Sequence, residues 1–151
     1  MVNKKVSIFI YCLIYLILNG ENVYGGMTDE EAKAEFTKII MSCASKLNVN
    51  MQDLMPMASM QVPTDQQVKC ALACAYRELG TMNDKGLYDL EGGHKLAEKT
   101  MKGDDERMKK AKEFADFCSA VNNEKVTDGE KGCDRAALIF KCTVKNAAKV
   151  T

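Results

Sequence analysis

The sequence predicts an all-α domain of six helices held together by disulfide bonds. Two observations point to this class. After an apolar leader, six cysteines remain in the chain, an even number that favours three disulfides in an oxidising compartment. Apolar residues recur at the three- and four-residue spacing of helices, and no stretch alternates apolar and polar residues long enough to predict a strand.

The leader is typical of a secretory signal peptide. Two lysines precede an apolar run over residues 6–18, which is too short to span a bilayer comfortably. Small residues favour cleavage after Gly25, with Gly20 as the second choice; a retained membrane anchor is the alternative. We therefore expect residues 1–25 to be a signal peptide, residues 26–151 to form one domain, and the protein to be secreted.

The predicted mature chain is close to neutral. The leader contains two lysines and one glutamate, so 19 basic residues face 20 acidic ones in residues 26–151. A near-neutral chain without a basic patch does not favour binding to nucleic acid or to an anionic membrane surface.

The first two predicted helices lie before residue 60. Thr28 and Glu31 form a capping-box pattern at the start of the first helix. One face of this helix carries the apolar residues Phe36, Ile39, Ile40, Cys43 and Leu47. A short second helix is expected over residues 51–59, interrupted by Pro56.

A third helix is predicted next, and a turn after it divides the domain. Thr64 and Gln67 repeat the capping-box pattern, and Gly80 is a plausible C-cap. Residues 83–86 (Asn-Asp-Lys-Gly) have turn chemistry.

Three more helices are predicted after this turn. Gly92 and Gly93 should weaken the fourth, each by about 1 kcal/mol relative to alanine. Asp104 and Asp105 suit the start of the fifth, which continues to about Val121, because negative charge is favourable at a helix N-terminus. The sixth, over residues 130–147, is apolar nearly all round, which predicts a central position.

Six cysteines allow 15 disulfide pairings, and helix geometry removes some of them. Cys133 and Cys142 lie roughly 13 Å apart along one predicted helix, beyond the bridging limit of about 7 Å. Cys70 and Cys74 lie one turn apart on one face, so a bond between them would distort the helix. About ten connectivities remain, and in each of them both cysteines of the third helix are bonded to other segments.

The same residues do not favour a metal site, a redox site or catalysis. His94 is the only histidine, the cysteine spacings are unlike paired zinc knuckles, and no Cys-x-x-Cys is present. No G-x-S-x-G or H-E-x-x-H surrounds His94, and Lys95 follows it where a phospholipase-like enzyme would show aspartate. We expect no metal, no cofactor and no enzymatic activity.

The intervals between the cysteines, in order, are 26, 3, 43, 14 and 8 residues. This spacing resembles the six-cysteine pattern of the insect odorant-binding and pheromone-binding proteins, in which the intervals of 3 and 8 are the tightest features. The resemblance covers essentially the whole of residues 26–151. It implies the disulfides Cys43–Cys74, Cys70–Cys133 and Cys118–Cys142.

The resemblance also implies a fold and a function. The six-helix, disulfide-stapled bundle should enclose a hydrophobic cavity that binds a small odorant, pheromone or lipid-like molecule and carries it towards a membrane olfactory receptor. The same scaffold carries other hydrophobic ligands in haemolymph, saliva or reproductive secretions. A protein-interaction module with a collapsed cavity is a further alternative, and weak homodimers would suit the family.

Methionines crowd the second predicted helix and suit an adaptable apolar surface, although any one of them can be ordinary core. With the family resemblance, they lead us to expect a ligand site. The residues predicted to line it are Ile39, Leu54, Met55, Met60, Leu72, Tyr76, Thr81, Met82, Leu90, His94, Met101, Met108, Phe114, Ala115, Leu138 and Phe140.

Three predictions within this set concern polar groups. Thr81, in Gly-Thr-x-Asn after the third helix, resembles family members that hold a ligand hydroxyl there; alternatively it bonds the last helical carbonyls. Tyr76 could add a phenol, or be a satisfied interface tyrosine. His94 is a candidate pH switch, because some family members release ligand on histidine protonation, or else a partly buried imidazole with its hydrogen bonds satisfied.

The C-terminal tail is short. Residues 143–151 cannot form the extra helix of long-tailed moth pheromone carriers. A brief lid from Ala147, Ala148 and Val150 is the most that this tail could offer.

Overall fold

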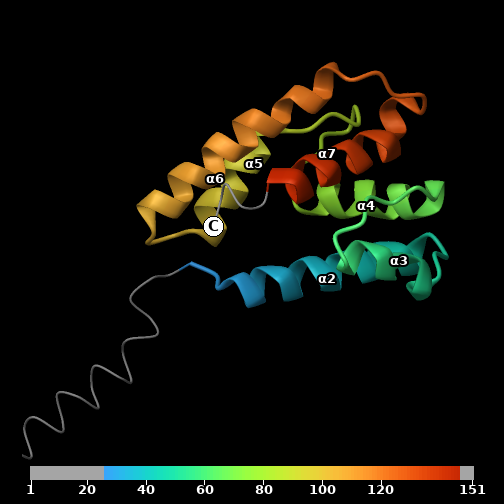
Figure 1. Ribbon diagram of the computed structural model, residues 1–151, viewed down its shortest axis with the longest axis horizontal. Coiled ribbons are helices and arrows are strands. Elements are labelled where there is room, and N and C mark those ends of the chain that lie inside the picture. The colour runs from blue at the N-terminus through green and yellow to red at the C-terminus, as the bar shows by residue number, and fades with distance from the viewer. Residues whose placement is uncertain (1–25, 147–151) are drawn as a thin grey trace, which may run out of the picture.

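The computed structural model describes residues 26–146 of the chain (Figure 1). Its α-helices are α2 (Asp29–Lys46), α3 (Met51–Ala58), α4 (Gln66–Glu78), α5 (Leu90–Thr100), α6 (Asp105–Cys118) and α7 (Cys133–Asn146). The 3₁₀ helices η1 (Ser119–Asn123) and η2 (Gly129–Lys131) lie between α6 and α7. The described residues contain no strand, only an isolated bridge between Met82 and Tyr88. The predicted all-α class is confirmed, whereas the expected signal peptide and the lid of Ala147, Ala148 and Val150 fall outside the described residues.

The start of α2 has the capping box that the sequence predicts. Thr28 Oγ1 accepts a hydrogen bond from the backbone N–H of Glu31 at 3.2 Å, and Glu31 Oε2 accepts one from the N–H of Thr28 at 2.7 Å. Asn50 caps α3 in a similar way, through the N–H of Gln52. Pro56 lies inside α3, which ends two residues later.

The capping residue of α4 differs from the prediction. Asp65, not Thr64, is the N-cap, and its Oδ1 accepts from the N–H of Val68 at 3.0 Å. A carboxylate one residue nearer the helix can take this position and also interact favourably with the helix dipole. Gly80 ends the helix as expected: it has φ +76°, and its N–H donates to Arg77 O at 3.0 Å.

The two glycines of α5 are explained by close packing. A Cβ added to Gly92 would lie only 1.6 Å from the carbonyl oxygen of Gly80, and one added to Gly93 would lie 2.4 Å from the Tyr88 hydroxyl. The first turn of α5 therefore packs directly against the end of α4, which the low helix propensity of glycine does not reveal.

Two helix boundaries in the C-terminal half also differ from the prediction. Val121 lies in η1, because α6 ends at Cys118. α7 begins at Cys133 rather than Glu130, since Asp128 Oδ2 accepts from the N–H groups of Cys133 and Asp134 at 2.7 and 3.1 Å and so caps the helix there.

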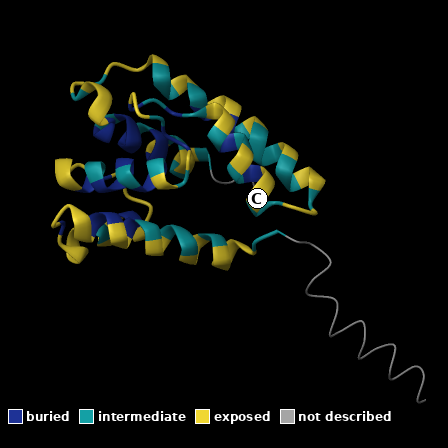
Figure 2. Cartoon of the chain, turned by 180° about the vertical axis from the view of Figure 1, so that it is seen from behind, coloured by how far each residue is buried: buried dark blue, intermediate teal, exposed yellow. Residues whose placement is uncertain are grey.

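The core lies mainly between α4 and α7, each of which has six buried residues. These helices lie side by side between the α2 and α3 segment and the α5–α6 pair (Figure 1). Figure 2 shows the buried residues on the facing sides of the helices and the exposed residues outside. The central position predicted for the last helix is therefore shared with α4. α7 also has an exposed side, which includes Lys141, Thr143 and Lys145.

α7 also contains a buried charged residue, which its largely apolar sequence does not suggest. Arg135 is 5% exposed, and its guanidinium donates to the carbonyl oxygens of Val121 and Glu124, the latter at 2.7 Å. These bonds connect α7 to η1 and the residue that follows it, so the cation serves the packing of a loop.

Three disulfides link four helices in series. Cys43–Cys74 joins α2 to α4, Cys70–Cys133 joins α4 to α7, and Cys118–Cys142 joins α6 to α7. This is the pairing that the family resemblance implies. Helix α4 carries two of the six sulfurs and therefore connects α2 to α7.

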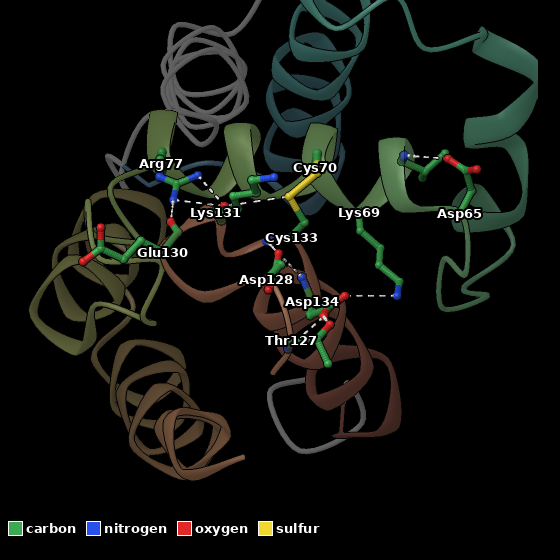
Figure 3. The surroundings of a disulfide bond; sticks show 11 residues. Asp65, Lys69, Cys70, Arg77, Thr127, Asp128, Glu130, Lys131, Cys133 and Asp134 are labelled. Carbon is green, nitrogen blue, oxygen red and sulfur yellow. Dashed lines mark hydrogen bonds and ion pairs between the residues drawn. A yellow bond between two sulfur atoms is a disulfide. The ribbon is translucent and has the colours of Figure 1, made fainter. Parts of the chain in front are cut away.

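Polar contacts surround the disulfide between α4 and α7 (Figure 3). Lys69 Nζ lies 3.3 Å from Asp134 Oδ1, and the guanidinium of Arg77 donates to the carbonyl oxygens of Glu130 and Lys131. The first turn of α4 is thereby held to the first turn of α7, and the last turn of α4 to η2, which precedes α7. Within residues 26–146, no helix combines the length and apolar character needed to cross a membrane.

Candidate ligand-binding cavity

An apolar cavity of about 750 Å³ lies among all six α-helices. Its lining contains six methionines: Met41, Met51, Met55, Met57, Met60 and Met101. Five aromatic residues join them: Phe36, Tyr76, Tyr88, Phe114 and Phe140. Lys33 is the one charged residue of the lining, so the wall offers a soft, polarizable and nearly uncharged surface.

The cavity has an exposed end and a buried end. At the exposed end, next to α2 and α3, Met41, Met51, Met55 and Met60 are 42–65% exposed. The buried end is formed by residues that are at most 9% exposed, among them Tyr76, Tyr88, Ala115, Ile139 and Phe140. Methionine side chains have several rotatable bonds, so the exposed end can adapt to a molecule that enters.

Ion pairs connect α2 to α5 and α6. Lys99 Nζ of α5 lies 3.1 Å from Glu35 Oε1, and Arg107 of α6 pairs with Asp29. Both pairs are partly exposed, so each should contribute at most about 1 kcal/mol. The N-terminal half of α2 is thus held to α5 and α6 by contacts weaker than a disulfide.

Most hydroxyl groups of the lining are bonded to the backbone. Thr81 Oγ1 donates to Tyr76 O at 3.2 Å, and Thr37, Thr100 and Thr143 each donate to a carbonyl of their own helix. Thr81 is therefore on the cavity wall and also bonds a carbonyl at the end of α4. Both interpretations of Thr81 are compatible with this geometry.

The two tyrosines at the buried end differ from these threonines. Tyr76 of α4 is 8% exposed and Tyr88 is 9% exposed. Burial raises the pKa of Tyr88 to about 12, with Asp116 and Asp89 adding to the effect. Burial also raises the pKa of Tyr76 strongly, and nearby Tyr88 adds to it. Both phenols are neutral at physiological pH.

The structure places nine of the sixteen predicted site residues on the cavity wall. They are Leu54, Met55, Met60, Tyr76, Thr81, Met101, Phe114, Ala115 and Phe140. They come from α3, α4, α6, α7 and the turns after α3, α4 and α5, so the fold brings distant parts of the chain to one surface.

The other seven predicted residues lie outside this lining. Leu72 is fully buried and Met82 is 4% exposed, because both belong to the packed part of the core. Ile39 contributes to a smaller pocket of about 410 Å³ beside α5. Leu90, at the first position of α5, is 36% exposed. Met108 and Leu138 are partly buried on other helix faces.

His94, the seventh, connects α5 to α6. Its Nε2 lies 2.8 Å from Asp116 Oδ1. The imidazole is about one-third exposed, and His94 is not part of the cavity lining. Helical spacing placed His94 on an apolar face of its predicted helix, whereas in the structure its partner is the carboxylate of Asp116 on α6.

Several lining residues were missed by the sequence reasoning. Phe36 and Ile40 were assigned to the apolar face of α2, and their place on that face could have suggested them. Tyr88 lies in the segment before α5, where no helical periodicity exists to indicate burial. Met41 and Met57 line the cavity as well, and the methionine-rich composition of this region could have pointed to them.

One cluster has the residue types of a metal site. The Sγ atoms of Cys43 and Cys74 and a carboxylate oxygen of Glu78 lie within 4.8 Å of one another. The two sulfurs are bonded to each other, so neither is a thiolate, the form that binds metals. Glu78 Oε1 instead accepts a hydrogen bond from Lys46 Nζ at 2.7 Å.

Helices joined by three disulfides around an apolar cavity define a small, disulfide-linked binding protein. Residues 26–146 match the PBP/GOBP family, and the chain belongs to that family. The family resemblance drawn from the cysteine spacing is thus confirmed. The family and the fold support a role as a carrier of small ligands.

Similar proteins agree with this assignment. General odorant-binding protein 28a of Drosophila melanogaster is 28% identical over 137 residues, which are 91% of this chain and 92% of that protein. The solved structure of odorant-binding protein 28a from Drosophila melanogaster has a TM-score of 0.61 and 27% identity, covering 81% of this chain and 97% of its own. The solved odorant binding protein 5 of Apis mellifera shares the fold, with a TM-score of 0.63 and 22% identity, over 82% of this chain and 95% of its own.

Proposed function

We propose that the protein is a secreted carrier that binds small hydrophobic odorants or pheromones in its cavity and delivers them towards membrane olfactory receptors. The observation that carries this proposal is the apolar cavity of about 750 Å³ in a chain of the PBP/GOBP family. The similarity to general odorant-binding protein 28a of Drosophila melanogaster supports the choice of ligand class.

The proposed mechanism is partition from water into a preformed cavity. Burying apolar surface contributes about 25 cal/mol per Å². A ligand of about 20 non-hydrogen atoms, at about 0.4 kcal/mol per atom, would bind with about 8 kcal/mol, near micromolar affinity. The nine predicted residues on the wall would contact the ligand, and the exposed methionines would surround its path of entry.

Displacement of a fluorescent apolar probe tests this proposal. Oxidised, delipidated protein should take up N-phenylnaphthylamine saturably and release it when a volatile apolar competitor is added. Absence of saturable uptake would contradict the carrier function. Mass spectrometry of lipid extracted from native protein would then identify the natural ligand.

Two other roles are distinguished by separate observations. A carrier of non-olfactory ligands would be expressed in saliva, haemolymph or reproductive tissue, so the site of expression separates it from an olfactory carrier. A protein-interaction module with a collapsed cavity would not bind the probe. The cavity volume does not favour that role.

The pH-switch role of His94 remains a prediction from the family resemblance. The histidine bonds Asp116 and lies outside the cavity lining, so protonation would act through the α5–α6 contact. If His94→Ala leaves the pH dependence of ligand release unchanged, the switch is excluded.

A further inference from the structure

The cavity contains two buried phenols whose hydroxyl groups have no protein partner in the described chain. Tyr76 and Tyr88 are both more than nine-tenths buried, and both line the cavity. Within residues 26–146, neither hydroxyl makes a hydrogen bond, whereas the threonine hydroxyls of the same wall donate to backbone carbonyls. Neither hydroxyl oxygen is among the fully buried, unpaired polar atoms of the described residues, so each keeps some accessible surface.

Most buried polar groups find a partner, and for a hydroxyl on a cavity wall that partner can be water or a ligand. A phenol can donate one hydrogen bond, and both phenols keep their proton at physiological pH since burial raises their pKa values. Both residues line the cavity, so its wall holds two phenol donors without a protein partner in the described chain.

The position of Tyr88 is well defined. Its backbone N–H donates to Asn122 Oδ1 at 2.8 Å, and Asn122 Nδ2 donates back to its carbonyl oxygen at 3.0 Å. The absence of a side chain at Gly93 leaves room for the hydroxyl, since a Cβ there would lie 2.4 Å from it. The donor is held in place before a ligand arrives, which lowers the entropic cost of using it.

Tyr76 is held equally firmly by α4. This helix is joined to α2 and α7 by disulfides at Cys74 and Cys70. The ring of Tyr76 packs against Phe36, with 6.3 Å between ring centroids. Rotation of the ring away from the cavity would disturb this contact.

We propose that the cavity selects neutral ligands that carry an oxygen acceptor, such as the carbonyl of a ketone, aldehyde or ester, and that Tyr76 and Tyr88 donate hydrogen bonds to it. The inference rests on the proposed carrier function. The apolar remainder of the ligand then extends towards the methionines at the exposed end. A carboxylate would leave a charge among neutral groups at the buried end, since the charged lining residue, Lys33, is exposed.

The test compares two ligands of equal length, dodecane and methyl decyl ketone, by displacement of N-phenylnaphthylamine. The double variant Tyr76→Phe/Tyr88→Phe removes both donors and keeps the rings. It should weaken ketone binding about 2- to 12-fold for each hydrogen bond lost and should not weaken dodecane binding. Ser42→Ala, which removes an exposed hydroxyl outside the cavity, should leave the ketone-to-alkane ratio unchanged.

An infrared measurement on the unmodified protein avoids dependence on the variants. The carbonyl stretch of bound, isotope-labelled ketone should lie below its value in an alkane solvent, as for a hydrogen-bonded carbonyl. A stretch equal to the alkane value, or an unchanged ketone-to-alkane ratio in the double variant, overturns the inference and leaves the carrier function intact. If neither ligand nor probe binds, both proposals fall.

Discussion

At the scale of single residues, Gly92 marks the closest contact between two turns. Alanine would favour the helix by about 1 kcal/mol, but its Cβ would lie 1.6 Å from Gly80 O. We expect Gly92→Ala to lower the free energy of unfolding by at least about 2 kcal/mol, because the backbone must shift to relieve the overlap. Urea denaturation measures this loss.

Gly80→Ala provides the comparison. Gly80 has φ +76°, and nothing lies within 4 Å of an added Cβ, so the cost is conformational strain alone, roughly 1 kcal/mol. If Gly92→Ala were no less stable than Gly80→Ala, the close approach of α5 to the end of α4 would be wrong.

Residue-scale prediction from the sequence worked where the signal was local. The capping box at Thr28 and the terminal glycine Gly80 depend on neighbours along the chain, and both have the expected roles. The prediction was wrong at the start of α4, where Thr64 and Asp65 are adjacent. Either residue type can cap a helix, and the backbone conformation determines which of the two does so.

At the scale of elements, the junction of α4 and α7 should respond to acid. A hydrogen bond from Thr127 Oγ1, at 2.8 Å, lowers the pKa of Asp134, and Lys69 contributes further. A carboxyl whose pKa is lower in the folded protein stabilises it above the unfolded pKa of about 3.9, and this contribution is lost as the pH falls through the folded value.

Asp134→Asn should therefore be less stable than the unmodified protein at pH 7, and the difference should shrink as the pH falls below about 4. Urea denaturation at several pH values measures it. Thr127→Val keeps the carboxylate but removes the hydrogen bond, so it should show part of the same loss at neutral pH. A difference that stays constant with pH would contradict the role of Asp134.

The helices themselves could be located from periodicity, because the apolar face of a helix follows from sequence spacing alone. Their ends were less predictable. α7 begins at Cys133 because Asp128 caps it from the preceding loop, and Val121 lies in a 3₁₀ turn instead of α6. Both boundaries depend on hydrogen bonds between segments that sequence spacing does not show.

At the scale of the whole molecule, we expect a substitution that fills the cavity to weaken ligand binding without lowering the stability of the fold. Ala115 is 5% exposed and lies at the buried end of the cavity. Ala115→Leu would place three more carbon atoms in that space, so we expect probe affinity to fall roughly tenfold, equivalent to about 1.4 kcal/mol. Stability should not fall, because the added apolar surface is buried in existing space.

Ala34→Leu is the matched control, since Ala34 is exposed on α2 and outside the cavity lining. It should leave probe binding as it is. Equal probe affinity in Ala115→Leu and the unmodified protein would show that the ligand occupies another place.

The sequence by itself determined the helical class, the six-cysteine spacing and hence the family, because capping, periodicity and cysteine intervals are properties of the chain. Only the tertiary structure decided which apolar residues face a cavity. Ile39 and Ile40 are neighbours on α2, yet only Ile40 lies on the wall of the larger cavity. Leu72 packs in the core one turn before Tyr76, which lines the cavity. Packed cores and cavity walls are built from the same kinds of apolar side chain. Whether such a side chain lines a cavity depends on whether another part of the chain packs against it, and the tertiary fold determines that.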